Sequence, residues 1–226
     1  MSASRRLQLL DWAQGSGSWI IEDDYDSEYR YGNMPIASLQ GLDHNSRVIY
    51  IGTFSKTLFP SLRLGYVVIP PDLVGHFAAV RHAMDIGSPT FFQAVLTDFM
   101  NEGHFARHIR RMRQLYAQRR IALVNELERE FGSTLEVLGS EAGMHLAVIL
   151  PKGFRDQEVA ARAASERLWL APLSPAYVGE TPRQGFILGF GSTPVEAMPK
   201  AVRHLKSLLF AEKGNSAKTT GHRGMS

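Results

Sequence analysis

Four side chains that could bind or react lie close together in the segment YIGTFSKTLFPSLRLGY, residues 50–66. They are Thr53, Ser55, Lys56 and Arg63. Apolar stretches on both sides predict that water has little access to this segment. Exclusion of water disfavours the ammonium form of a lysine and lowers its pKa, so the free amine can form a Schiff base with an aldehyde. The hydroxyl groups and the arginine fork are donors that suit a phosphate group.

Two predicted strands position this segment. Val48–Ile51 is an apolar, β-branched stretch that predicts a buried strand, and Leu64–Ile69 predicts a second one. A lysine in a loop between two strands can also be an ordinary solvated residue. Lys56 taken alone does not separate the two interpretations.

A second polar cluster, EDDYDSEYRY at residues 22–31, follows a strand predicted at Trp19–Ile21. Acidic residues at the carboxyl end of an apolar strand lie where α/β folds place their ligands. A polar loop with helix-capping aspartates is the alternative interpretation of this cluster.

The whole pattern predicts an α/β fold with a largely parallel sheet, followed by an α+β layer. The α/β part of this prediction rests on the order of the elements, which is a strand, a crossover and two more strands with helices on the flanks. The expected helices are 7–13, 72–84, 91–101, 104–131, 157–168 and 194–210, and the later strands are 135–137, 144–150, 169–171 and 186–190.

The helix expected at 104–131 has one apolar face and, between the apolar residues, a row of Arg and His side chains. A basic helix can contact nucleic acid. We interpret this row instead as a solvated face, because no aromatic side chains suited to base stacking lie among the basic residues. His145, on an apolar strand, is interpreted as a packed core histidine.

Composition is that of an ordinary globular protein: of 226 residues, 44% are hydrophobic and 21% are charged. No apolar stretch approaches the roughly 18 residues of a membrane span. The chain has no cysteine, so we expect no disulfide and no thiolate metal site. We identify no metal-binding residues. The net charge of +3 does not by itself imply nucleic acid. No signal-peptide pattern follows Met1, and we expect a cytoplasmic protein.

Three strings, EDDYDSEYRY, GTFSKTLFPSLRLGY and HFARHIRRMRQLYAQRR, occur in this order. They resemble the aminotransferase-like domain of the MocR group of GntR-type transcription regulators, which has the fold-type I architecture of pyridoxal phosphate (PLP) enzymes. The resemblance implies PLP as the cofactor, a Schiff base at Lys56, pairing of Asp23 with the pyridine nitrogen, and a bond from Tyr25 to the ring hydroxyl. It also implies that the phosphate group is held by Thr53, Ser55 and Arg63.

The same resemblance implies a domain organisation. Residues 1–103 correspond to the C-terminal half of the large PLP-binding domain, 104–212 to a long linking helix and the small C-terminal domain, and 213–226 to a disordered tail. In the family this domain senses a small effector, an amino acid or amine, and the intact protein is a homodimer. DNA is bound by a winged helix-turn-helix domain that has no counterpart here. We therefore interpret the chain as a truncated product, with no membrane partner.

Two alternatives remain, a free-standing class I/II aminotransferase that acts on amino acids and a relic that keeps the fold without the cofactor. Fold-type I aminotransferases usually carry an arginine just before the strand equivalent to Leu188–Phe190, where it binds the substrate α-carboxylate. Ile187 occupies that place here. Arg183 is the nearest candidate for the carboxylate of a substrate or effector, and a loop charge is its alternative role. Amino-acid specificity and ordinary transamination therefore stay open.

Overall fold

The computed structural model describes residues 1–32, 37–85, 90–139, 141–179 and 181–210. The chain divides into two compact units, Met1–Met112 and Arg113–Ser226. The expected boundary between residues 103 and 104 stays a prediction, and the tail predicted at 213–226 lies outside the described residues. Across the described ranges, no helix combines the length and apolar character needed to cross a membrane.

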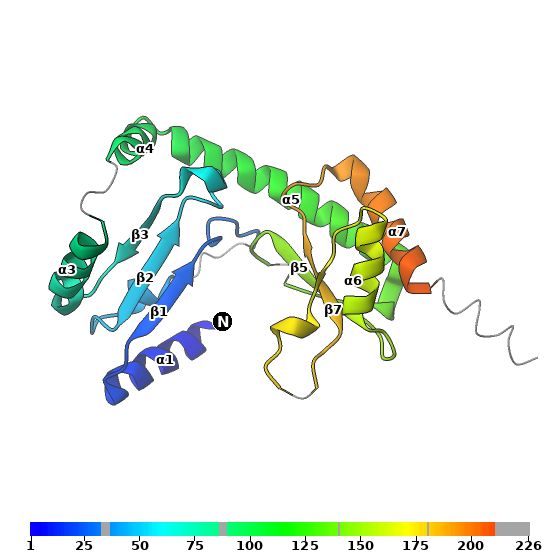
Figure 1. The fold of residues 1–226 in the computed structure, drawn as a ribbon, viewed down its shortest axis with the longest axis horizontal. Helices are drawn as coiled ribbons and strands as arrows, with labels where there is room; N and C mark the ends of the chain where they lie inside the picture. The colour runs from blue at the N-terminus through cyan, green and yellow to red at the C-terminus, as the bar shows by residue number, and fades with distance from the viewer. Residues whose placement is uncertain (33–36, 86–89, 140, 180, 211–226) are drawn as a thin grey trace, which may run out of the picture. The chain divides into compact units, whose positions relative to one another are not determined.

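A three-stranded sheet forms the centre of the first unit (Figure 1). Its strands are β1 (Ile20–Asp24), β2 (Val48–Thr53) and β3 (Gly65–Val68), in the order β1-β2-β3. β1 and β2 are parallel, as expected, whereas β2 and β3 are antiparallel. The connection 54–64 reverses the chain, because a parallel partner needs a crossover of about a dozen residues or more.

Two helices cover one face of this sheet. α1 (Ala3–Ser16) ends at Gly17, whose left-handed φ of 68° favours glycine, and α2 (Leu39–Leu42) follows β1. Successive side chains of a strand point to opposite faces. Ile20 of β1 and Val48 of β2 are register partners and share the covered face. They form a buried hydrophobic core with Leu10, Ala13 and Leu39.

Glu22 connects both helices to the sheet. Its side chain lies on the same face as Ile20, two residues earlier. The carboxylate accepts hydrogen bonds from the backbone N–H groups of Leu39 (2.8 Å) and Gln40 (3.0 Å) at the start of α2. Arg6 of α1 forms an ion pair with it at 3.4 Å. A carboxylate in this position satisfies N–H groups that a helix leaves unpaired, so Glu22 has a structural role.

The opposite face of the sheet is far less covered. Ile21 of β1 is 67% exposed and Val67 of β3 is 43% exposed, although the sequence predicts buried strands. After β3, a 3-10 turn leads into α3 (Val74–Met84), which contains no buried residue. α4 (Phe91–Asn101) follows and buries Leu96.

α5 (His104–Phe131) is the long helix that the sequence predicts. Part of its basic row makes internal contacts rather than facing solvent. His108 Nε2 lies 2.9 Å from the carbonyl oxygen of Thr57, and the Arg119 guanidinium donates to the carbonyl of Gly191. The predicted apolar face is confirmed by the burial of Ile109, Tyr116, Leu123 and Leu127.

The second unit contains a four-stranded antiparallel sheet in the order β4-β5-β7-β6 (Figure 1). Its helices α6 (Asp156–Ser165) and α7 (Met198–Phe210) agree with the alternating pattern of the sequence. α7 begins later than expected, because Pro194 precedes a 3-10 turn. The strands are β4 (Glu136–Leu138), β5 (His145–Ile149), β6 (Ala171–Pro172) and β7 (Gly185–Gly189).

A buried carboxylate joins separate parts of the second unit. Asp156 has no exposed surface and accepts hydrogen bonds from the Ser174 N–H (2.7 Å), the Ser174 hydroxyl (2.6 Å) and the Gly185 N–H (3.0 Å). Burial alone would raise the pKa of Asp156, but the hydrogen bonds from Ser174 and Gly185 outweigh burial and lower the pKa below its ordinary value. The charged carboxylate therefore anchors the start of α6 to β7.

His145 differs from its interpretation as a core residue, because its side chain is exposed. It begins β5, where the buried residues Leu146 and Val148 alternate with residues of the other face. The ring lies over Gly189 of β7, since a Cβ added to that glycine would come within 3.3 Å of the His145 Cδ2 atom.

Candidate functional site

Asp23 and Thr53 lie on the same face of the first sheet, near the carboxyl ends of adjacent strands. The parallel register pairs Asp23 of β1 with Ile51 of β2, and Thr53 follows Ile51 by two residues. Residues two apart in a strand point to the same side. This is the sparsely covered face, because Glu22 and its helices occupy the other one. The structure thus places two predicted site residues on one accessible face.

The segment that carries Lys56 is held at both ends by hydrogen bonds. The backbone N–H of Phe54 donates to the carbonyl of Leu64 (3.0 Å), which closes the connection between β2 and β3. The backbone N–H of Ser55 donates to the Thr53 Oγ1 atom (3.1 Å). That contact uses an acceptor lone pair of Thr53, so the hydroxyl hydrogen of Thr53 remains available to a ligand.

Two more contacts reach this segment from other parts of the first unit. The hydroxyl of Tyr29, a fully buried residue, lies 3.4 Å from the carbonyl oxygen of Lys56 and donates to it. His108 of α5 contacts the next carbonyl, that of Thr57, at 2.9 Å. Both contacts are to the backbone, so they fix the course of the chain and leave the Lys56 side chain uncommitted.

The Lys56 side chain is exposed, which corrects the expectation that apolar neighbours keep water away from it. The difference has a physical reason in β3, which is exposed along its whole length. A strand in that position does not screen the segment from solvent. The described residues therefore leave the Lys56 amine accessible to water.

Arg63 has a strained backbone. It follows the 3-10 turn Pro60–Leu62 with φ 51° and ψ 34°, in the left-handed region. Such a conformation costs a non-glycine residue roughly 1–3 kcal/mol, and strained residues cluster at ligand-binding sites. Ser46 and Arg167 adopt the same conformation outside the candidate site, so the role of Arg63 rests on its side chain and stays a prediction.

The charged side chains predicted for the site have no polar partner among the described residues. Within the described part of the chain, no hydrogen bond or ion pair engages the side chains of Asp23, Lys56 or Arg63. Tyr25, directly after β1, is 45% exposed. Charged and hydroxyl side chains that have no other partner, next to strand ends, can bind the phosphate group and the ring nitrogen of a ligand.

Asp24 behaves differently from its neighbour Asp23, because it lies on the covered face. Its carboxylate accepts hydrogen bonds from the Tyr50 hydroxyl (2.8 Å) and from the backbone N–H of Ser27 (3.2 Å). Burial raises the pKa of Tyr50 well above its ordinary value, and the hydrogen bonds with Asp24 and Tyr66 add to the effect. Asp24 is therefore engaged in holding β1, β2 and the following turn together.

Arg183, the candidate for carboxylate binding, lies in the second unit and forms an ion pair with Glu136 of β4. Ile187, which stands where aminotransferases of this type carry an arginine, is in the middle of β7 and pairs with Ala147 and Ala171. The role of Arg183 stays a prediction, and the ion pair occupies its guanidinium.

The sequence did not identify the residues that support the site, namely Tyr29, Tyr50 and His108. Tyr29 and Tyr50 bond groups that are 27 and 26 positions away along the chain, and no local pattern indicates such contacts. The sequence predicts His108 to be part of the solvated basic row. Its position directly before the buried Ile109 of α5 was the available signal.

Comparison with known proteins defines the class. The family profile of aminotransferase class I and II matches residues 3–187. The chain therefore belongs to the aminotransferase class I and II family. Its fold is that of fold-type I PLP-dependent transferases, with a partial large domain. The crystal structure of Pyrococcus horikoshii kynurenine aminotransferase in complex with PMP matches with a TM-score of 0.86 at 28% identity, over 94% of this chain and 52% of that one.

Two curated relatives are transcription regulators. The chain is 40% identical over 207 residues to the uncharacterized HTH-type transcriptional regulator YhdI of Bacillus subtilis, over 92% of this chain and 44% of that protein. It is 39% identical over 217 residues to the probable rhizopine catabolism regulatory protein MocR of Rhizobium meliloti, over 96% of this chain and 44% of that protein. The chain thus spans less than half the length of these relatives.

Proposed function

We propose that this chain is the PLP-binding, effector-sensing domain of a MocR-type transcription regulator of the GntR superfamily. The observation that carries the proposal is identity of 40% and 39% to two regulators over more than nine-tenths of the chain. The cofactor follows from the fold, because the kynurenine aminotransferase of the same fold binds PMP, the amino form of PLP. We place the protein in the cytoplasm.

The phosphate group of the cofactor would be bound by Thr53, Ser55 and Arg63. The contact from the Ser55 N–H to Thr53 Oγ1 leaves the Thr53 hydroxyl hydrogen available, and Arg63 offers an uncommitted guanidinium. Two hydroxyl donors and a planar guanidinium group, which can donate two parallel hydrogen bonds, suit a phosphate dianion. Lys56, between these residues, would bond covalently to the carbonyl carbon of the cofactor.

The pyridine ring would be held at the end of β1. Asp23 presents an uncommitted carboxylate on the accessible face, where it would hold a proton on the ring nitrogen. Tyr25 would donate a hydrogen bond to the ring hydroxyl. When bound, PLP supplies a ring that withdraws electrons from an attached amino compound. Asp23 therefore suits the cofactor in residue type and in face, and Tyr25 suits it in residue type.

The partners follow from the regulator relatives. We propose an amino acid or amine as the effector, and a homodimer as the assembly of the intact protein. DNA would be bound through a helix-turn-helix domain outside the matched segment, because one of the two regulators is described as HTH-type. Arg183 is the candidate for an effector carboxylate, and it would have to exchange its ion pair with Glu136.

A free-standing aminotransferase is the second candidate function. It is favoured by the match to a kynurenine aminotransferase. It is opposed by Ile187, which occupies the place of the usual carboxylate-binding arginine. An amino acid can bind without that arginine, but efficient turnover requires the carboxylate to be held in register with the cofactor.

The two functions are separated by one experiment. The protein is loaded with PLP and titrated with a panel of amino acids and amines, while absorbance and keto-acid formation are followed together. A change in absorbance without keto acid supports the sensor. Stoichiometric or repeated formation of keto acid supports the enzyme. No PLP-dependent absorbance, or the same absorbance in Lys56→Ala, would overturn both.

A further inference from the structure

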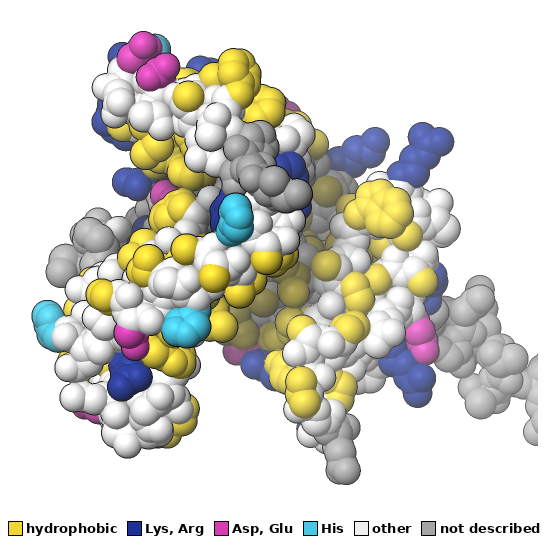
Figure 2. All heavy atoms as spheres, turned by 60° about the vertical axis from the view of Figure 1, so that its left-hand side comes forward, with side chains coloured by type: hydrophobic (Ala, Val, Ile, Leu, Met, Phe, Trp, Pro, Cys, Tyr) yellow, Lys and Arg dark blue, Asp and Glu magenta, His cyan; other side chains and the backbone are white. Residues whose placement is uncertain are grey.

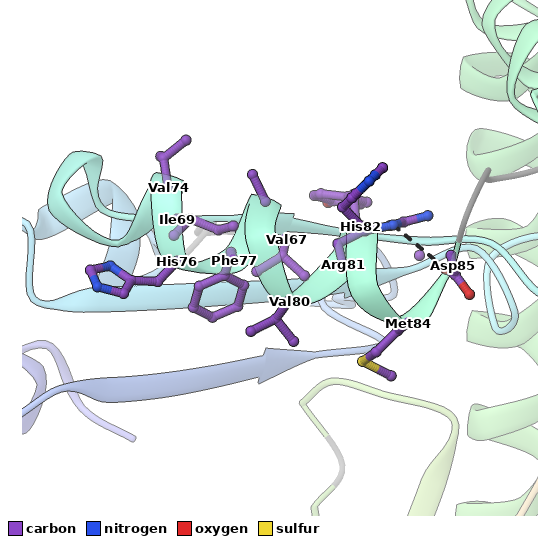
Figure 3. Close-up of a pocket in the computed structure, with 13 residues that line it drawn as sticks. Val67, Ile69, Val74, His76, Phe77, Val80, Arg81, His82, Met84 and Asp85 are labelled. Atoms are coloured by element: carbon purple, nitrogen blue, oxygen red, sulfur yellow. Dashed lines mark ion pairs between the residues drawn. The ribbon is translucent and has the colours of Figure 1, made fainter.

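A broad hollow of about 1080 Å³ lies along β3 and α3 in the first unit. Figure 3 shows Val67 of the strand and Phe77 and Val80 of the helix in its lining. The lining is open to solvent, because Val67 is 43% exposed and Val80 is 58% exposed, and Figure 2 shows hydrophobic side chains gathered on this side of the first unit. Small-molecule sites enclose most of the surface of their ligand. This open hollow therefore does not define the size or the chemistry of a ligand.

A much smaller pocket, of about 110 Å³, lies within the second unit. α5 contributes Leu123 to its lining, β7 contributes Leu188, and α7 contributes Met198 and Val202. The segment just before β6 contributes Trp169. The pocket thus lies where two helices, the end of a strand and a connecting segment meet.

The walls of this pocket are fixed by burial and by hydrogen bonds. Phe190 and Met198, which line it, are 1% and 2% exposed. The backbone N–H of Phe190 donates to the carbonyl of Met144 (3.2 Å), and the Arg119 guanidinium donates to the carbonyl of Gly191. These contacts hold the chain in place after β7. The pocket is therefore formed before a ligand binds, as small-molecule sites usually are.

The volume of the pocket restricts the size of a ligand. A well-packed interior has few voids larger than a water molecule, which takes up about 30 Å³ in the liquid, so a pocket of about 110 Å³ is more than a packing gap. Ligands of drug size occupy pockets of about 300 Å³ or more, whereas an apolar cavity of about 150 Å³ binds benzene. The pocket therefore fits a single small ring.

The lining favours an uncharged aromatic ligand. Among the described residues that form it, none is charged, and its polar side-chain groups are the Thr193 hydroxyl and the Trp169 indole N–H. Burial of an unpaired charge in such surroundings is costly. The rings of Trp169 and Phe190 favour contact with another aromatic ring, and so does the thioether of Met198. Trp169 is 85% exposed, so its ring is accessible to a ligand at the entrance.

We propose that this pocket of the second unit binds an uncharged aromatic compound with a single ring, which fills the space between α5, β7 and α7 and contacts Trp169 at the entrance. Binding removes apolar surface of both the ligand and the pocket from water. The site is separate from the predicted cofactor residues, all of which lie in the first unit. The proposal therefore requires neither PLP nor the sensor function.

The test titrates the full chain, without PLP, with toluene and with benzoate in a calorimeter. The two compounds share the ring, and benzoate carries a negative charge in place of the methyl group. We expect toluene to bind with a dissociation constant of about 1 mM or lower. Benzoate should bind at least tenfold more weakly, because the lining offers no positive charge to the carboxylate.

Three variants assign the binding to this pocket. Ala201→Leu on α7 adds a larger side chain to the lining, and Ala161→Leu makes the same change at an exposed position of α6. We expect toluene to bind at least tenfold more weakly to Ala201→Leu and with wild-type affinity to Ala161→Leu. Trp169→Ala changes an exposed side chain at the entrance and should weaken binding at least threefold.

Three results would overturn the proposal. They are no binding of toluene, equal binding of benzoate and toluene, and wild-type affinity for toluene in a folded Ala201→Leu or in Trp169→Ala. If Ala201→Leu does not fold, the result for Trp169→Ala decides, since its side chain is 85% exposed and contributes little to the core.

Discussion

The hydroxyl of Tyr50 on β2 donates a hydrogen bond of 2.8 Å to the carboxylate of Asp24 on β1. The bond lies on the covered face of the first sheet. Asp23, one residue earlier, points to the opposite face. This contact on the covered face thus joins the end of β1 to the middle of β2. The other face of the end of β1 presents Asp23, which is proposed to bind the cofactor.

Replacing Tyr50 by phenylalanine keeps the ring and removes the donor. We expect Tyr50→Phe to lower the free energy of unfolding by about 1.5–3 kcal/mol, as for hydrogen bonds to charged groups. Urea unfolding at pH 7 measures the change. Tyr177→Phe, at an exposed hydroxyl of the second unit, is the control and should be neutral. Equal stability of Tyr50→Phe and the wild type would contradict the role of this bond.

The same pair predicts a dependence on alkaline pH. The folded-state pKa of Tyr50 is raised above its unfolded value of about 10. Its contribution is therefore fully present below about pH 10 and is lost as the pH rises toward the folded-state pKa. The stability difference between wild type and Tyr50→Phe should shrink above that pH. A constant difference up to strongly alkaline pH would refute this coupling.

Asp156 should govern the acid stability of the second unit. Its pKa is lowered in the folded state, so its contribution is present above the unfolded pKa of about 3.9 and is lost as the pH falls through the folded-state pKa. Asp156→Asn should lower stability at pH 7 by about 1–3 kcal/mol and flatten the acid decline. Thermal unfolding between pH 7 and pH 3 measures both effects, with the exposed Asp72→Asn as control. If the stability of Asp156→Asn falls as steeply as that of the wild type when the pH is lowered, other groups cause the acid unfolding.

Asp23 and Asp24 should differ in cofactor binding, although they are neighbours. Asp23→Asn removes the carboxylate proposed to hold a proton on the ring nitrogen. We expect PLP affinity to fall at least tenfold, or about 1.4 kcal/mol, in a fluorescence titration. Asp24→Asn should leave the affinity near that of the wild type and lower stability instead. The reverse result would move the ring-nitrogen role to Asp24.

DNA binding by this chain alone should be weak and independent of sequence. The basic row of α5 supplies charge, and part of it is used internally by His108 and Arg119. Positively charged side chains bind DNA in a salt-sensitive, sequence-independent way when no helix or strand enters a DNA groove to contact the bases. Gel-shift titration should show equal affinity for promoter and random fragments. A clear preference for one fragment would show that α5 is a recognition element.

The sequence predicted those elements whose burial is marked by periodicity. The apolar spacing along α5 identified its face, and the stretch Val48–Ile51 identified β2. The same reasoning failed for the strand predicted at Leu64–Ile69. Its apolar residues are exposed in β3, because burial of a strand depends on distant residues that cover it and not on its own composition.

The candidate site could be predicted only in part for a similar reason. Local strings identified Lys56 and Asp23, because the residues next to each of them in the sequence indicate its chemistry. The contacts that support them depend on register. Alternation assigns Asp23 and Asp24 to opposite faces, but the position of α1 and α2 decides which face is covered.

Chemical trapping of the cofactor tests the central claim most directly. The protein is incubated with PLP and reduced with borohydride, which makes the bond between an amine and the cofactor permanent, and the labelled peptides are mapped. The account predicts that the label lies on Lys56, is absent from Lys56→Ala, and persists in Lys152→Ala, a variant of another exposed lysine. Label on other lysines in preference to Lys56 would contradict it.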